Sequence, residues 1–211
     1  MGVTITANGG ASSSNVSAGQ FQGFFDPASE GDGPGAEADD YFRFFCIDLA
    51  QYAQAGPNTY TRNLGVPDAT NSAQLTRLFN QFYPNPTTAT YYSGGQTDFG
   101  SFPSAGASAA FQLALWEIWF DDDMNLATGA FRASSSNAAV ITLAQSELNA
   151  VGTGSTPAPG WTFYEFNSRS KQDYLSVVRT LRTVPEPGTL ALLSIAVLSA
   201  WWIAMRRRQT A

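Results

Sequence analysis

The C-terminal 28 residues constrain this chain more than any other segment, because they place a short motif, an apolar run and a basic cluster in a fixed order. The run over residues 189–205 carries no charge, and as a helix it would reach about 26 Å, near the lower limit for crossing a bilayer. A cluster of three arginines favours the cytoplasmic side of a membrane. The tail therefore predicts a transmembrane helix, with the preceding residues outside the cytoplasm. In order, the motif and the basic cluster are Val184-Pro185-Glu186-Pro187-Gly188 and Arg206-Arg207-Arg208.

This tripartite tail resembles the PEP-CTERM sorting signal of Gram-negative bacteria. The resemblance implies that an intramembrane exosortase cleaves near the Pro-Glu-Pro and passes the protein from the inner membrane to the cell surface or to an extracellular polysaccharide matrix. It divides the chain into an exported domain, 1–183, and a sorting signal made of the motif 184–188, the transmembrane helix 189–205 and the basic tail 206–211. Residues 1–6 lack a basic segment followed by an apolar one, so we expect the N-terminal signal peptide to be missing from this chain.

Composition excludes several classes of function. Residues 1–188 hold 8 Lys and Arg against 17 Asp and Glu, a net charge of −9, which argues against a nucleic-acid partner. The chain has one cysteine, Cys46, and no histidine. It therefore contains no internal disulfide, no Ser-His-Asp triad, no Cys-His dyad and no His-ligated metal site.

The order of expected elements is strands, then helices, then strands, which indicates an α+β fold. We expect a mixed β-strand core with an inserted portion of three helices, plus the one C-terminal transmembrane helix. A Gly/Ser/Asn-rich loop should cover 8–19, and the second helix should bury one stripe of apolar side chains. Expected strands are 3–6, 21–25, 41–49, 60–64, 161–166 and 174–179. Expected helices are one through residue 82 capped by Asn71 or Ser72, one that begins near 105–108 and ends at about 120, and one over about 136–151.

Two segments stand out together: Phe45-Cys46-Ile47-Asp48 on an expected strand and the segment from Phe111 to Ile118 on an expected helix. They resemble the bacterial thioester domain, in which a strand cysteine condenses with a helix glutamine of a Thr-Gln-x-Ala-x-Trp motif. The resemblance implies an internal thioester between Cys46 and Gln112, surrounded by Phe45, Asp48, Phe111 and Trp116. Where the family has Thr, this chain has Phe111, so a hydroxyl group that could orient the acyl group is missing.

The chemistry requires close positioning, because an amide is a poor electrophile and a thiol is a poor nucleophile toward it. A strand and a helix can hold the pair in place, and the surrounding aromatic rings would exclude water. Ammonia leaves as the thioester forms, and an amine on another surface can then attack it. The function implied is covalent attachment to amine-bearing surfaces, without a cofactor and without enzymatic turnover.

An alternative remains open at this point. Cysteine is often buried as a plain apolar residue, and a glutamine on an apolar helix can simply bond to the backbone. The protein would then be a passive surface or matrix component with the same fold and no thioester.

Two weaker patterns concern acidic residues. The run from Asp121 to Asn125 places oxygens where a calcium loop begins, but Leu126 and Arg132 replace its glycine and final glutamate. We interpret the run as a polar helix end and turn, and we assign no metal site. Glu117 and Asp121 share one helical face, which is the minimum for a carboxylate-dependent hydrolase, but nothing marks a sugar cleft.

Overall fold

The computed structural model describes residues 2–7, 11–24, 41–51, 53, 55–66, 69–84, 102–121, 123–154 and 161–179. All of them belong to one compact unit, residues 1–180. The strands are β1 (Gly2–Ala7), β2 (Ala11–Ser17), β3 (Phe21–Phe24), β4 (Tyr41–Cys46), β5 (Thr61–Leu64), β6 (Arg132–Ser134), β7 (Trp161–Asn167) and β8 (Tyr174–Arg179). The helices are α2 (Ala69–Phe82), α3 (Ala105–Phe120) and α4 (Ala138–Thr153). The α+β class and the three inserted helices are confirmed.

A five-stranded antiparallel sheet has the order β3-β4-β8-β7-β5. In β4, three consecutive residues, Phe44–Cys46, are buried, as expected for a strand covered on both faces. By contrast, β5 is exposed at all four positions and lies at one edge of the sheet. The 41–49 strand ends three residues earlier than expected, at Cys46.

A second sheet corrects the sequence interpretation. Residues 8–19 were expected to form a loop, but Ala11–Ser17 pair antiparallel with β1 as strand β2. The short strand β6 pairs with the other side of β1 and was not expected. Serine-rich and three-residue segments carry little strand signal of their own, so pairing with β1 decides their conformation. In β1 the buried side chains alternate at Val3, Ile5 and Ala7.

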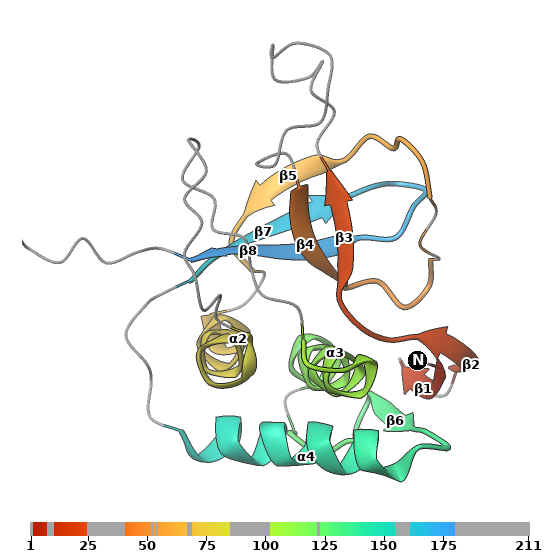
Figure 1. Ribbon diagram of the computed structural model, residues 1–211, viewed down its shortest axis with the longest axis vertical. Coiled ribbons are helices and arrows are strands. Elements are labelled where there is room, and N and C mark those ends of the chain that lie inside the picture. Colours follow the sequence, from red (N-terminus) through yellow and green to blue (C-terminus); the bar gives the residue numbers. More distant parts are fainter. Residues whose placement is uncertain are drawn as a thin grey trace, which may run out of the picture. The chain divides into compact units, whose positions relative to one another are not determined.

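The helices form two layers against the five-stranded sheet: α2 and α3 lie between this sheet and α4 (Figure 1). Helix α3 starts where expected, with Ser104 as its N-cap, which accepts a hydrogen bond from the backbone amide of Ala107. Helix α2 begins at Ala69, before the expected cap at Asn71 or Ser72, and α4 is capped by Asn137 rather than beginning at 136.

The central position of α3 corrects a second expectation. All ten residues from Ala109 to Ile118 are buried, so the helix has no single apolar stripe. A helix that is apolar on every side is one enclosed by other elements. The polar side chains on this segment, Gln112 and Glu117, are therefore buried as well.

No helix within the described ranges is long and apolar enough to cross a membrane. The segment 189–205, for which the sequence predicts a transmembrane helix, lies outside those ranges, as do the sorting motif and the three arginines.

Candidate functional site

The side-chain amide of Gln112 contacts the backbone of Cys46 through two hydrogen bonds. The backbone amide of Cys46 donates to Oε1 of Gln112 at 3.2 Å, and Nε2 of Gln112 donates to the Cys46 carbonyl oxygen at 3.0 Å. Cys46 is the last residue of β4 and Gln112 lies in the middle of α3, so the pair links the sheet to the central helix. Two segments 66 residues apart in sequence thus meet at the positions singled out from the sequence.

Trp116 completes this contact. Its indole Nε1 donates to the same Cys46 carbonyl oxygen at 2.7 Å. Gln112 and Trp116 are four residues apart and therefore lie on one face of α3. Their shared acceptor makes the Cys46 carbonyl group the point at which α3 is attached to β4.

Aromatic rings pack beside the contact on the helix side of the sheet. The Phe45 ring lies 5.1 Å from that of Phe111 and meets Phe79 edge to face at 5.9 Å. Phe111, which stands where the related motif has Thr, is fully buried and also packs against Phe79. At this position the chain has a core residue instead of a hydroxyl group.

The Cys46 thiol is free and only 5% exposed. Burial, and to a smaller extent the negative charge of Asp48, raises the pKa of the thiol to about 12. At neutral pH the sulfur is therefore protonated and a weak nucleophile. Asp48 is half-buried, and its carboxylate accepts a hydrogen bond from the backbone amide of Ala50 at 2.7 Å.

The sequence did not single out two tyrosines near this thiol. Tyr174 is the register partner of Cys46, and side chains of register partners share a sheet face. The Tyr60 ring lies 5.5 Å from the Tyr174 ring. Burial raises the pKa of both hydroxyl groups. The second-largest cause in each case is the other tyrosine, which lowers the pKa of Tyr60 through a hydrogen bond and raises that of Tyr174. Only strand pairing, for Tyr174, and the ring contact with it, for Tyr60, bring these residues near Cys46, from which both are distant in sequence.

Gln172 is a second residue that the sequence did not indicate. It is 3% exposed, and its Nε2 donates to the Asp48 carbonyl oxygen and to that of Asp173. The backbone amide of Ile47 also donates to the Asp173 carbonyl oxygen, at 2.9 Å. These bonds fix the chain just after Cys46 against the turn before β8.

The pair Glu117 and Asp121 does not form an open carboxylate site. Glu117 is fully buried, and the Asp121 carboxylate accepts hydrogen bonds from the backbone amides of Ala130 and Phe131. This arrangement offers no surface on which a sugar could lie between the two acids.

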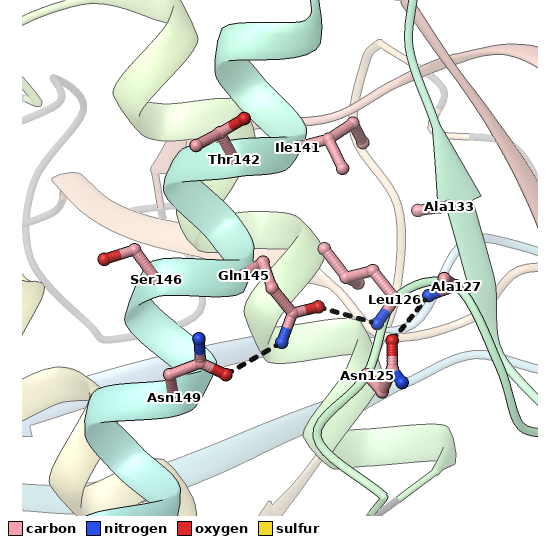
Figure 2. A pocket seen from close by; sticks show the side chains of 9 residues that line it. All are labelled: Asn125, Leu126, Ala127, Ala133, Ile141, Thr142, Gln145, Ser146 and Asn149. Atoms are coloured by element: carbon pink, nitrogen blue, oxygen red, sulfur yellow. Dashed lines mark hydrogen bonds between the residues drawn. The ribbon is translucent and has the colours of Figure 1, made fainter.

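A pocket lies between α4 and the loop after α3 (Figure 2). One of its lining residues, Gln145, joins the two elements: its Oε1 accepts from the backbone amide of Leu126 at 3.1 Å, and its Nε2 donates to Asn149 Oδ1 at 3.1 Å. The pocket is lined by Asn125, Leu126, Ala127, Ala133, Ile141, Thr142, Gln145, Ser146 and Asn149. None of these residues contacts Cys46 or Gln112 in the hydrogen bonds described above, so the pocket is a separate feature.

Comparison with known proteins identifies the tail. The PEP-CTERM protein-sorting motif matches residues 183–208, so the chain carries this motif, which supports an exported surface protein. No curated protein matches the chain at a significant level.

Two solved bacterial structures align with this chain at low sequence identity. The N-terminal domain of the Streptococcus pyogenes pilus tip adhesin Cpa has 14% identity and a TM-score of 0.42, over 80% of this chain and 97% of that one. The N-terminal thioester domain of a surface protein from Clostridium perfringens has 12% identity and a TM-score of 0.39, over 68% and 84%.

Proposed function

We propose that this chain is an exported surface protein that attaches covalently to amine-bearing surfaces through an internal thioester between Cys46 and Gln112. The observation that carries the proposal is the pair of hydrogen bonds between the Gln112 amide and the Cys46 backbone. These bonds hold the acyl carbon of Gln112 beside the residue that supplies the thiol. A reaction between a poor electrophile and a poor nucleophile requires such close positioning.

The thioester forms when the sulfur of Cys46 replaces the side-chain nitrogen of Gln112. The sulfur of Cys46 attacks the side-chain carbonyl carbon of Gln112, the bond from that carbon to Nε2 breaks, and ammonia leaves with the thiol proton. Negative charge develops on Oε1 in the tetrahedral intermediate, and the Cys46 backbone amide already donates to this oxygen. An external amine then attacks the thioester, which gives an amide on Gln112 and regenerates the thiol.

Trp116 keeps the Cys46 carbonyl group hydrogen-bonded after the thioester has formed. When Nε2 leaves as ammonia, the Cys46 carbonyl oxygen loses one of its two side-chain donors. The indole of Trp116 remains hydrogen-bonded to it, so the product contains no unpaired buried carbonyl group there.

The intact mass of the full chain tests the thioester. We expect a wild-type mass lower by one ammonia, and the full mass in Cys46→Ala, which has no thiol. Treatment with methylamine should replace the deficit with one added methylamine. Hydrolysis gives Glu at position 112 instead, a product distinguished from the unreacted amide by high-resolution mass.

The free-thiol content of the same samples serves as the control. A wild-type chain with its full amide mass, a thiol that reacts only after denaturation and no methylamine adduct would refute the thioester. It would leave the sorting motif unaffected.

The C-terminal tail directs the export of the domain in this proposal. We propose that the segment 189–205 forms a transmembrane helix, that an exosortase cuts near Pro185–Pro187, and that the domain 1–183 then passes to the cell surface or its matrix. The support for this step is the match of the sorting motif to residues 183–208. The domain itself needs no catalytic machinery for this step.

Replacing both Pro185 and Pro187 with alanine tests the processing step. In cells that contain the exosortase we expect the double variant to keep its tail, and wild-type chain to lose it, as read by intact mass. Pro57→Ala, in an exposed loop, is the matched control and should be processed like wild type. Normal cutting of the double variant would contradict the processing proposal.

A passive surface role is the second candidate, and two observations favour it. Cys46 is 5% exposed and Gln112 is fully buried, which limits access for an external amine. The Cys46 side chain also shares a sheet face with Tyr174, so the thiol has to turn toward Gln112 before it can react. The methylamine experiment separates the two roles, because a passive protein takes up no amine.

A further inference from the structure

Three acidic side chains meet at the C-terminal end of α3. One oxygen from each of Glu117, Asp121 and Asp123 lies within 4.8 Å of the others. Three negative charges this close repel one another strongly unless protons or a cation are present. In the sequence, the run that begins at Asp121 was compared with a calcium loop, whose last acidic ligand lies at its C-terminal end. In the structure the third acid is Glu117, which precedes this loop on α3.

The burial of the Glu117 carboxylate also indicates that a cation belongs at this place. Its side chain is fully buried, and while Oε1 accepts a hydrogen bond from the backbone amide of Asn125 at 3.0 Å, Oε2 has no hydrogen-bond partner. Buried carboxylates in proteins are normally paired or bound to a metal.

The loop backbone closes around the carboxylates at Gly129. This residue has φ = 82°, and a Cβ atom there would lie 2.6 Å from Asp123 Oδ2 and would also collide with the Asp121 carboxylate. Only glycine leaves room for both oxygens. The loop backbone therefore forms a cradle against Asp121 and Asp123, although the Asp123 side chain stays exposed to solvent.

The loop is also fixed from outside. Gln145 on α4 accepts a hydrogen bond from the backbone amide of Leu126 (Figure 2) and donates one to the Met124 carbonyl oxygen at 2.8 Å. Since both bonds are to backbone atoms, they hold the loop in place whatever the charge of its acids. The cradle is thus pre-organised for a ligand.

We propose that Glu117, Asp121 and Asp123 bind one calcium ion. The donors are all carboxylate oxygens, which suit hard divalent cations, and the chain has no histidine that would favour zinc. Calcium fits better than magnesium because it accepts irregular geometry, whereas magnesium demands a nearly ideal octahedron. The ion gives the unpartnered oxygen of Glu117 a partner and ties the end of α3 to the following loop.

Calorimetric titration of the full chain with calcium, after removal of metals by EDTA, tests the proposal. We expect one ion per chain with Kd of about 10⁻⁴ to 10⁻³ M, the range of extracellular calcium modules. With calcium at about ten times Kd, Tm should rise by about 3–6 °C over the EDTA-treated protein. Magnesium at the same concentration should give a smaller shift.

Two variants and a matched control locate the site. Glu117→Gln and Asp123→Asn should each weaken calcium binding at least tenfold. Glu147→Gln should leave it unchanged, although Glu147 is also a buried acid with an unpartnered Oε2 and a pKa raised to about 8 by burial.

Several results would overturn the proposal. They are a wild-type chain with no calcium heat and no Tm shift, a preference for magnesium, or wild-type calcium affinity in Glu117→Gln. The first would mean that a proton shared between Glu117 and Asp123 neutralises the cluster. Because the wild-type titration alone decides this point, the proposal does not depend on the variants folding.

Discussion

Replacing Phe79 with alanine is expected to lower the free energy of unfolding by about 3–5 kcal/mol. Phe79 is fully buried, and its ring packs against five others, which come from α3, from the sheet and from the residue just after α2. Removing the ring leaves a cavity that neighbouring rigid elements cannot fill completely. Its ring partners are Phe45, Tyr83, Phe111, Trp161 and Phe163.

Urea unfolding of the full chain, followed by tryptophan fluorescence, measures this loss. Leu64→Ala is the control, because Leu64 is 75% exposed on the edge strand β5, and its removal should change stability by less than about 0.5 kcal/mol. Similar midpoints for the two variants would show that Phe79 is not the centre of the core.

The same substitution bears on the candidate site. Phe79 contacts both Phe45, next to Cys46, and Phe111, next to Gln112. A loosened core therefore releases the strand and the helix that hold the reacting pair. We expect the ammonia deficit, where it forms in wild type, to form more slowly in Phe79→Ala.

Changing Gln112 to Glu is expected to cost about 2–5 kcal/mol of stability near neutral pH. The new carboxylate would be fully buried, and one of its oxygens would face the Cys46 carbonyl oxygen, to which the amide nitrogen now donates. Two hydrogen-bond acceptors, the new carboxylate oxygen and the Cys46 carbonyl oxygen, would then face each other without a proton between them. Hydrolysis of a thioester gives this same side chain, so the variant also measures what the domain loses when water breaks the bond.

The penalty should depend on pH in a definite direction. Burial raises the pKa of the introduced acid in the folded state above its unfolded value of about 4.3. The folded state then binds the proton more tightly, so the penalty is present above the folded pKa and is relieved as pH falls toward the unfolded one. A protonated carboxyl group can again donate to the Cys46 carbonyl oxygen.

Urea unfolding at neutral and at acidic pH measures this relief. Gln22→Glu is the control, since Gln22 is exposed on β3, and it should show little change at either pH. A Gln112→Glu variant as stable as wild type at neutral pH would contradict the hydrogen-bond geometry described for Cys46.

Sequence alone predicted the elements whose signal is local. The amphipathic pattern of α2 and the apolar segments of β7 and β8 gave boundaries within a few residues. By contrast, β2 and β6 carry weak strand signals, and only pairing with β1 decides their conformation.

The candidate site divides in the same way. The resemblance of two short segments to the thioester domain singled out Cys46, Gln112 and Trp116, and the spacing of Gln112 and Trp116 on one helix is a local property. Tyr174 and Gln172 could not be identified, since only strand register and a turn bring them near Cys46.

The sequence by itself determined the sorting motif at 183–208, the absence of histidine chemistry and the order of the three helices and of all described strands except β2 and β6. Tertiary structure decided which polar side chains are buried and what they face. The Gln112 amide meets Cys46 because α3 packs against β4, and Glu117 meets Asp123 because the loop after α3 folds back on the end of the helix. Burial and long-range contact depend on how distant segments pack together, and no local pattern of residues contains that information.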